Sequence, residues 1–178
     1  EVCLDCPFSR SSGSGKCYTH KINQYFGFIS SLKAQVKKFP TFEDIPEYSK
    51  DIYNEILKIS KDKYIRFGSY GEPSLHPLEL MEGVTQIAKN WTGYTHQYFR
   101  KPEYSNYLMA STHNSRQTGT AKAKFGYRSF MATAETNEVK AVVCPASKEG
   151  GFKSNCSDCG LCSGTNGKGK VNIKILEH

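Results

Sequence analysis

The sequence predicts an α/β fold with an open, mainly parallel sheet or a partial (β/α) barrel, followed by a C-terminal cysteine knuckle. Short strand-like segments alternate with helical segments from residue 64 onward. Parallel neighbouring strands need a crossover connection, usually a helix, so this alternation predicts a parallel sheet. About five strands are apparent, which is too few for a closed eight-stranded barrel. All seven cysteines fall into two spaced sets, and these predict the knuckle.

Two helices are expected before the sheet, over residues 22–38 and 43–60. In the second, isoleucine and tyrosine recur every three or four positions and form one apolar stripe, which is typical of a helix that packs on a core. Thr41 is a suitable N-cap for this helix, with Asp44 three residues later.

The strand-like segments that follow end in turns rich in Gly, Pro, Asn and Ser. The expected strands are 64–67, 93–98, 107–111, 127–132 and 139–143. The expected helices are 77–90 and 114–125, with a short helical turn between the second and third strands. We expect Leu78, Met81 and Val84 on the inward face of the first of these helices.

These elements divide the chain into three parts. Residues 1–143 form a β/α domain with an N-terminal three-cysteine loop, residues 144–175 form a four-cysteine metal-binding segment, and residues 176–178 resemble the start of a purification tag. The composition is 38% hydrophobic and 12% aromatic, as in folded globular domains. A net charge of +7 admits an anionic partner such as a nucleic acid, although dispersed lysines also suit a solvated surface. No apolar run approaches the roughly 20 residues that cross a bilayer, so we expect no membrane partner.

The first cysteine set consists of Cys3, Cys6 and Cys17, with His20 three residues beyond. Two interpretations are open. Three thiolates can hold a four-iron cluster and leave one iron open for a ligand. Alternatively, His20 completes a zinc site with the three cysteines, because its spacing from Cys17 is typical of zinc ligands.

The second cysteine set consists of Cys144, Cys156, Cys159 and Cys162. Three closely spaced cysteines with a remote Cys-Pro resemble the ferredoxin pattern, although here the remote cysteine comes first. Four thiolates also suit tetrahedral zinc, with Asp158 and Gly160 in the knuckle. The odd number of cysteines and the C-x2-C spacings favour metal over disulfides. We expect iron–sulfur clusters of the 4Fe–4S type, in two sites, with zinc as the alternative.

Polar residues gather where the expected strands end, and parallel sheets bind ligands at the carboxyl ends of their strands. The candidate ligand-binding residues are Gly71, Glu72, Pro73, His96, Ser111 and Asn114. Each also has a purely structural explanation: Glu72 can cap the next helix, His96 can be a buried histidine, and Asn114 can be a turn residue.

The early three-cysteine loop, Gly71-Glu72-Pro73 at a strand end and the parallel β/α array resemble the radical SAM superfamily. The resemblance implies a four-iron cluster on the first cysteine set and an auxiliary cluster on the second. It also implies that Gly71, Glu72 and Pro73 contact the methionine amine of S-adenosylmethionine, and that Ser111 and Asn114 contact its ribose and carboxylate. The spacing C-x2-C-x10-C departs from the superfamily's C-x3-C-x2-C, and Tyr70 stands where the motif has its first glycine.

The stretches at 3–8, 91–97 and 144–162 resemble a group of cysteine-rich bacteriophage proteins, which implies a phage origin and the host cell cytoplasm but no particular activity.

The leading hypothesis is a phage iron–sulfur protein with a radical-SAM-like fold that binds S-adenosylmethionine or a nucleoside, and enzymatic activity is left open. The rival is a zinc-stabilised nucleic-acid-binding protein that acts in phage replication or host takeover. The rival draws on aromatic and basic residues that could bind bases and phosphates: Tyr94, Tyr98, Phe99, Arg100, Lys101 and Tyr104. A third possibility is that both metals serve folding alone.

Overall fold

The computed structural model describes residues 49–69, 71–133 and 140–176, together with positions 30, 33, 34, 37 and 38. Those single positions are helical, and the rest of the helix expected over 22–38 lies outside the described residues. So do Thr41, the first cysteine set and His20. The chain divides into two compact units, Glu1–Glu55 and Ile56–His178, and the sheet belongs to the second.

Helix α2 spans Lys50–Ser60 and starts at a serine cap. The hydroxyl of Ser49 accepts a hydrogen bond from the backbone N–H of Ile52 at 3.2 Å, which satisfies one of the donors that a helix start leaves unpaired. Ile59, which the expected apolar stripe includes, is 64% exposed, so this position does not face a core.

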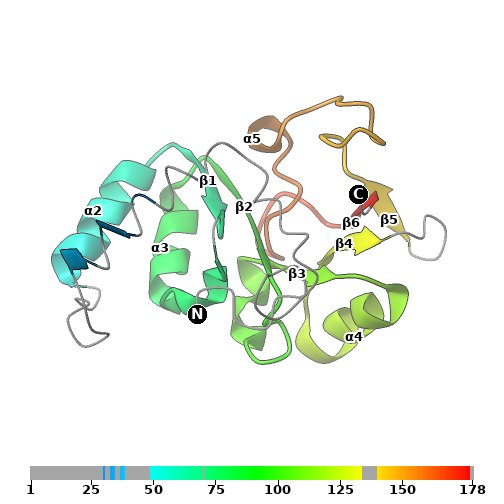
Figure 1. The fold of residues 1–178 in the computed structure, drawn as a ribbon, viewed down its shortest axis with the longest axis horizontal. Coiled ribbons are helices and arrows are strands. Elements are labelled where there is room, and N and C mark those ends of the chain that lie inside the picture. The colour runs from blue at the N-terminus through cyan, green and yellow to red at the C-terminus, as the bar shows by residue number, and fades with distance from the viewer. Residues whose placement is uncertain are drawn as a thin grey trace. The chain divides into compact units, whose positions relative to one another are not determined.

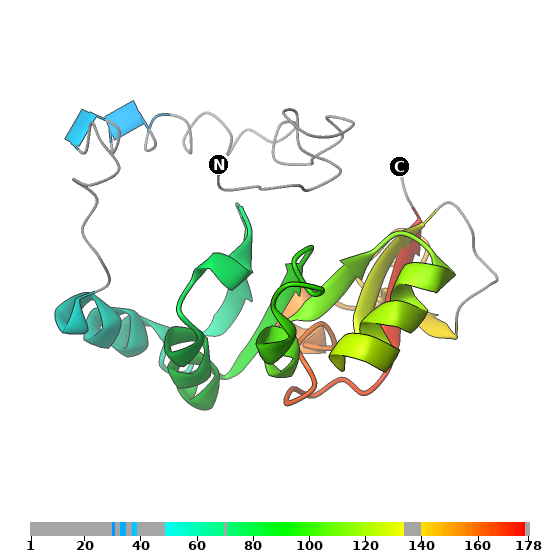
Figure 2. The same ribbon diagram turned by 90° about the horizontal axis from the view of Figure 1, so that it is seen from below.

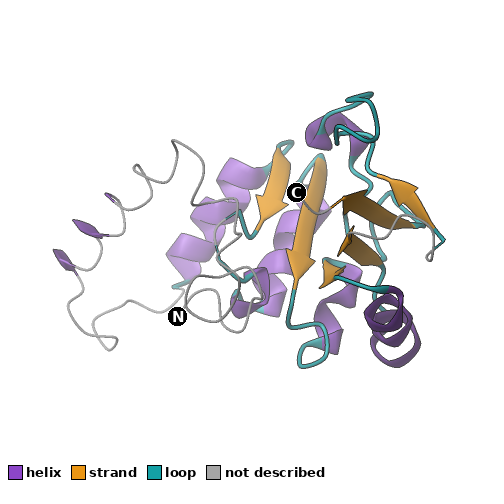
Figure 3. Cartoon of the chain, turned by 45° about the vertical axis from the view of Figure 1, so that its right-hand side comes forward, coloured by secondary structure: helices purple, strands orange, loops and turns teal. Residues whose placement is uncertain are grey.

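The described residues contain an open sheet of six strands in the order β1-β2-β3-β4-β6-β5, and every neighbouring pair is parallel (Figures 1 and 3). This confirms the predicted α/β class. The strands are β1 Tyr64–Phe67, β2 Asn90–Thr95, β3 Met109–Thr112, β4 Ser129–Thr133, β5 Ala141–Val143 and β6 Asn172–Leu176.

β3, β4 and β5 each begin two residues later than expected, and two other strands differ more from the prediction. β2 begins three residues before the expected start at 93 and ends at Thr95, so His96 follows the strand instead of lying within it. β6 was not expected as a strand. It lies between β4 and β5, and Leu176 is its last residue, paired with Thr133.

The crossover helices cover one face of the sheet. Helix α3 (Leu78–Ile87) links β1 to β2, the 3₁₀ helix η3 (Pro102–Asn106) links β2 to β3, and α4 (Ser115–Phe125) links β3 to β4. Figure 2 shows them one after another alongside the strands. The core between these elements and the sheet contains Met81, Leu108, Ala110, Ala121 and Tyr127. The described part of the chain has no helix long and apolar enough to cross a membrane.

The other face of the sheet is covered by residues 144–171, which we call the cysteine segment. Neighbouring residues of a strand point to opposite faces. Accordingly, Ala110 packs with the helices, whereas Met109 packs with Cys162 and Ile173. Figure 1 shows this segment, in orange, running from β5 through the short helix α5 (Cys156–Cys159) toward β6.

Arg128, directly before β4, holds the cysteine segment on the sheet through hydrogen bonds. Its side chain is 8% exposed, so its charge is nearly removed from water. The guanidinium donates hydrogen bonds to the carbonyl oxygens of Leu161 at 2.8 Å, Ser163 at 2.6 Å and Val171 at 3.1 Å. Burial lowers the pKa of Arg128 from its ordinary value. The carbonyl dipoles therefore replace the hydration that the charge has lost.

Candidate metal centre

The four cysteines of the second set line one pocket on the sheet face opposite the helices. Cys144 directly follows β5 at the start of the cysteine segment, and the other three begin twelve residues later in the same segment. Thr92 of β2 and Ile173 of β6 form the floor of this pocket. The cavity left between these side chains is about 10 Å³, roughly the space of one water-sized body. The fold thus brings together the cysteines that spacing alone assigned to one set.

The local sequence explains how Cys156 and Cys159 are presented. Asn155 caps α5, because its side-chain oxygen accepts from the backbone N–H of Asp158 at 3.0 Å. Gly160 ends the helix with a φ of 60°, a left-handed conformation that favours glycine. A Cβ at Gly160 would also lie 1.7 Å from the amide nitrogen of Asn90. The two cysteines therefore sit at the ends of a single helical turn that rests on β2.

Cys162 is the most deeply buried of the four thiols, with 8% of its surface exposed. Its carbonyl accepts from the backbone N–H of Gly93 at 3.1 Å, and its thiol is hydrogen-bonded to the hydroxyl of Tyr94. The pKa of Cys162 is raised to about 12, mainly by burial and to a smaller extent by the neighbouring cysteines. The hydrogen bond from Tyr94 acts in the opposite direction.

Cys144 shows the same opposition between burial and hydrogen bonding. Burial raises the pKa of its thiol above the ordinary value, while the backbone N–H groups of Ala146 and Ser147 lower it. Burial disfavours the charged thiolate form of these cysteines, and a cation bound among the sulfurs would favour it. The donor set is four sulfurs with backbone N–H groups directed at one of them, and thiolates are the ligand type of zinc and iron–sulfur centres. Within residues 49–69, 71–133 and 140–176, no group of three or more His, Cys, Asp and Glu side chains is placed so that it could hold a metal ion.

At the strand ends, Glu72 is engaged within the chain. It is 7% exposed, and one carboxylate oxygen accepts from the backbone N–H of Ser74 at 3.1 Å and from its hydroxyl at 2.9 Å. The other oxygen accepts from the backbone N–H of His96 at 3.0 Å. Glu72 thus caps the 3₁₀ helix η2 (Pro73–Leu75) and joins the turn after β1 to the end of β2. Gly71, with a φ of 85°, gives this turn its left-handed residue.

The other candidates at the strand ends are His96, Asn114 and Ser111, and each has a different local role. His96 faces His113 across the ends of β2 and β3, with ring centroids 6.0 Å apart and planes within 13°. Asn114 caps α4, since its side-chain oxygen accepts from the backbone N–H of Gln117 at 2.9 Å. Ser111 lies inside β3, two residues after Met109 and therefore on the face that carries the cysteine segment. A role for these residues in cofactor binding stays a prediction.

Of the four aromatic residues proposed to stack on bases, one is buried, one is exposed, and Tyr94 and Tyr98 are partly buried. Tyr104 is 4% exposed and donates its hydroxyl to the carbonyl of His76 at 2.7 Å. Tyr94 packs on Phe130 with ring centroids 4.4 Å apart. Phe99, by contrast, is 43% exposed. The guanidinium of Arg100 lies 5.1 Å from the centre of its ring.

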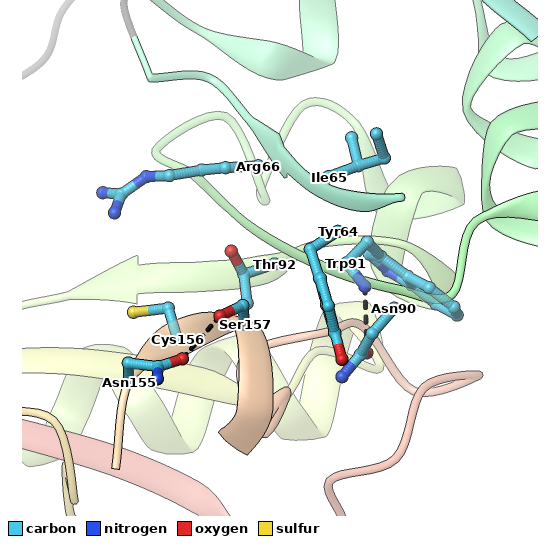
Figure 4. Close-up of a pocket in the computed structure, with 9 residues that line it drawn as sticks. All are labelled: Tyr64, Ile65, Arg66, Asn90, Trp91, Thr92, Asn155, Cys156 and Ser157. Carbon is cyan, nitrogen blue, oxygen red and sulfur yellow. Dashed lines mark hydrogen bonds between the residues drawn. The ribbon is translucent and has the colours of Figure 1, made fainter. Parts of the chain in front are cut away.

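A second pocket beside the cysteine pocket, with a volume of about 320 Å³, was not found from the sequence (Figure 4). It is lined by β1, β2 and α5. Arg66 was the available signal, because it interrupts an otherwise apolar strand, but a solvated arginine is the ordinary explanation of that pattern.

Comparisons with models of protein families, with curated proteins and with solved structures find no match to this chain. The resemblances to the radical SAM superfamily and to cysteine-rich phage proteins therefore stay predictions, and the case for a function rests on the site itself.

Proposed function

We propose that this chain is a metal protein in which Cys144, Cys156, Cys159 and Cys162 hold a thiolate-bound centre. The observation that carries the proposal is that four cysteines from two separate places in the sequence line one pocket. A purely structural role for each cysteine does not explain why all four line the same pocket. Arg128 and the bond between Gly93 and Cys162 fix the cysteine segment against the sheet without any metal.

An iron–sulfur cluster is the first candidate for the metal, because three cysteines at two-residue gaps with a remote Cys-Pro are typical of four-iron sites. Zinc is the alternative, supported by the single helical turn between Cys156 and Cys159 and by the left-handed Gly160 that follows. When bound, a cluster would supply electron transfer, whereas zinc would supply folding free energy.

Metal analysis on protein purified without oxygen tests the proposal. We expect iron and sulfide together with broad absorption near about 400 nm. A Cys156→Ser/Cys159→Ser variant should lose this centre. The matched Cys3→Ser/Cys17→Ser variant should keep it, because its substitutions fall in the first cysteine set. Colourless protein with stoichiometric zinc would support the alternative, and protein that binds neither metal would refute the proposal.

Binding of S-adenosylmethionine is a further part of the leading hypothesis, supported by Gly71-Glu72-Pro73 at the end of β1. Equilibrium dialysis of the metal-loaded protein against labelled S-adenosylmethionine measures it directly. Retention of the label by wild-type protein, and its loss on Glu72→Gln, is the expected result. Dialysis that leaves no label with wild-type protein would remove this cofactor from the hypothesis.

The alternative of a nucleic-acid-binding protein is supported best by Phe99 and Arg100, because Phe99 is 43% exposed whereas Tyr104 is buried. Exposed aromatic rings beside arginine suit single strands, and such binding weakens steeply with salt. Filter binding of labelled single-stranded DNA and RNA at low and moderate salt tests it, with Phe99→Ala as the variant. No retention even at low salt would end this alternative.

A further inference from the structure

The second pocket has the size of a small-molecule site. Its volume of about 320 Å³ falls in the range of ligand pockets, and it is far larger than a phosphate or an acetate needs. Figure 4 shows Tyr64, Ile65 and Arg66 of β1 on one side and the residues of α5 on the other. Thr92 and Cys156 line both this pocket and the cysteine pocket, so the two are neighbours on one face of the sheet.

Arg66 gives this pocket its charge. Of the described residues that line the pocket, Arg66 is the one with a basic side chain. Its guanidinium lies 6.0 Å from the centre of the Tyr94 ring, a cation–π contact that restricts where the side chain can reach. Lys89 adds a second positive charge close by, with its ammonium 5.0 Å from the Tyr64 ring. The planar fork of a guanidinium matches the oxygens of a phosphate.

The rest of the lining favours a ligand with a flat ring. Tyr64 supplies an aromatic side chain, and Figure 4 shows it reaching from β1 toward Asn90. Ile65 and Trp91 are paired in the sheet and their side chains point to its opposite face, so they border the pocket with their backbone. The hydroxyls of Thr92 and Ser157 add a few polar groups. The acid nearest to this lining in sequence, Asp158, directs its carboxylate to the amide of Asn155 at 2.7 Å, and it is not among the lining residues.

We propose that this pocket binds a nucleoside monophosphate, either as a free mononucleotide or as one unit of a single-stranded nucleic acid. The phosphate contacts Arg66, and the base lies against Tyr64. This inference goes beyond the proposed metal centre and does not depend on which metal is bound, because Arg66 and Tyr64 are not metal ligands.

Trp91 gives the test an optical signal, because it is the single tryptophan of the chain and lies in β2 between Asn90 and Thr92, both of which line the pocket. The full chain is titrated with each of the common nucleoside monophosphates and with a short single-stranded oligonucleotide while tryptophan fluorescence is recorded. Calorimetry repeats the titration, so that binding without a fluorescence change is still seen. We expect saturable binding of at least one of these ligands. A higher affinity for the oligonucleotide than for every mononucleotide identifies a nucleic acid as the source, and the reverse identifies a free nucleotide.

Arg66→Gln should raise the dissociation constant by about tenfold or more, because it removes a charged donor to the phosphate. Arg66 is exposed on β1, so this variant should fold normally, and thermal unfolding checks that it does. Arg116→Gln, which removes an equal charge from an exposed position of α4, should leave the dissociation constant unchanged. Metal content is measured on the same samples: loss of metal in Cys156→Ser/Cys159→Ser tests the centre, whereas loss of nucleotide in Arg66→Gln tests this pocket. Absence of binding in both titrations, or equal weakening by the two arginine variants, would overturn the inference.

Discussion

Replacement of Arg128 by methionine tests whether one buried guanidinium holds the cysteine segment on the sheet. Three carbonyl oxygens, those of Leu161, Ser163 and Val171, lose a charged donor in this variant. A hydrogen bond that involves a charged group stabilises a protein by about 1.5–3 kcal/mol. Methionine keeps the apolar contacts of the arginine stem, and water can reach part of the segment after it loosens. We therefore expect the free energy of unfolding to fall by about 3–5 kcal/mol.

Urea unfolding of metal-free protein, followed by the fluorescence of Trp91, measures this change without a contribution from bound metal. The damage should be centred on the cysteine segment, because all three acceptors belong to it. Cys162, which is 8% exposed, should then react with a thiol reagent much faster than it does in the wild-type protein.

Two controls frame this experiment. Arg116→Met removes an exposed arginine from α4, and its effect should stay within about 0.5 kcal/mol. Arg128→Lys keeps the charge but loses the planar fork, so its stability should lie between those of wild type and Arg128→Met. An Arg128→Met variant that unfolds within about 1 kcal/mol of wild type, with Cys162 still protected, would refute the reasoning.

Three further variants test local features of the fold. Gly160→Ala places a Cβ 1.7 Å from the Asn90 amide at a positive φ, and should cost about 1–3 kcal/mol of unfolding free energy in urea; an unchanged midpoint would show that the contact yields freely. Asn114→Ala removes the cap of α4 and should cost about 1 kcal/mol by the same assay, whereas no loss would mean that another group satisfies the helix start. Tyr127 is 1% exposed, and burial raises the pKa of its hydroxyl above the ordinary value of 10.0. The folded state thus holds this proton more tightly than the unfolded state, so its contribution to stability is complete below pH 10 and is lost as the pH rises further. Tyr127→Phe should make that alkaline decline shallower, and equal slopes for the two proteins in urea unfolding across this range would contradict the assignment.

The fold class could be predicted because its signals are local. Helix α4 was expected over 114–125 and spans Ser115–Phe125, since Asn114 caps its start and Gly126, with a φ of 73°, ends it. The second cysteine set was likewise predicted from spacing alone. β6 could not be predicted in the same way. It is a strand because it pairs with β4 and β5, and both of these partners are distant in sequence.

The site was predicted only in part, for a related reason. Spacing indicates which cysteines belong together, but it does not tell where their pocket lies, and the pocket is on the face of the sheet beside Thr92 and Ile173. Glu72 was also expected as a possible helix cap, and in the structure it caps η2 by accepting from the backbone N–H of Ser74. The roles of Arg66 and Arg128 depend on residues about 90 and 35 positions away, and no local pattern of the sequence encodes such distances.

The place of β6 has a consequence for how the protein is made. β6 is the last strand of the described residues, yet it lies in the interior of the sheet, between β4 and β5. While a ribosome is still synthesising the segment before it, β4 has an open edge and β5 has no partner in the sheet. Pairing across such long separations in sequence is slow, and open strand edges favour aggregation. Completion of the sheet must therefore wait for residues 172–176, and a nascent chain that stops short of them should need chaperones to remain in solution.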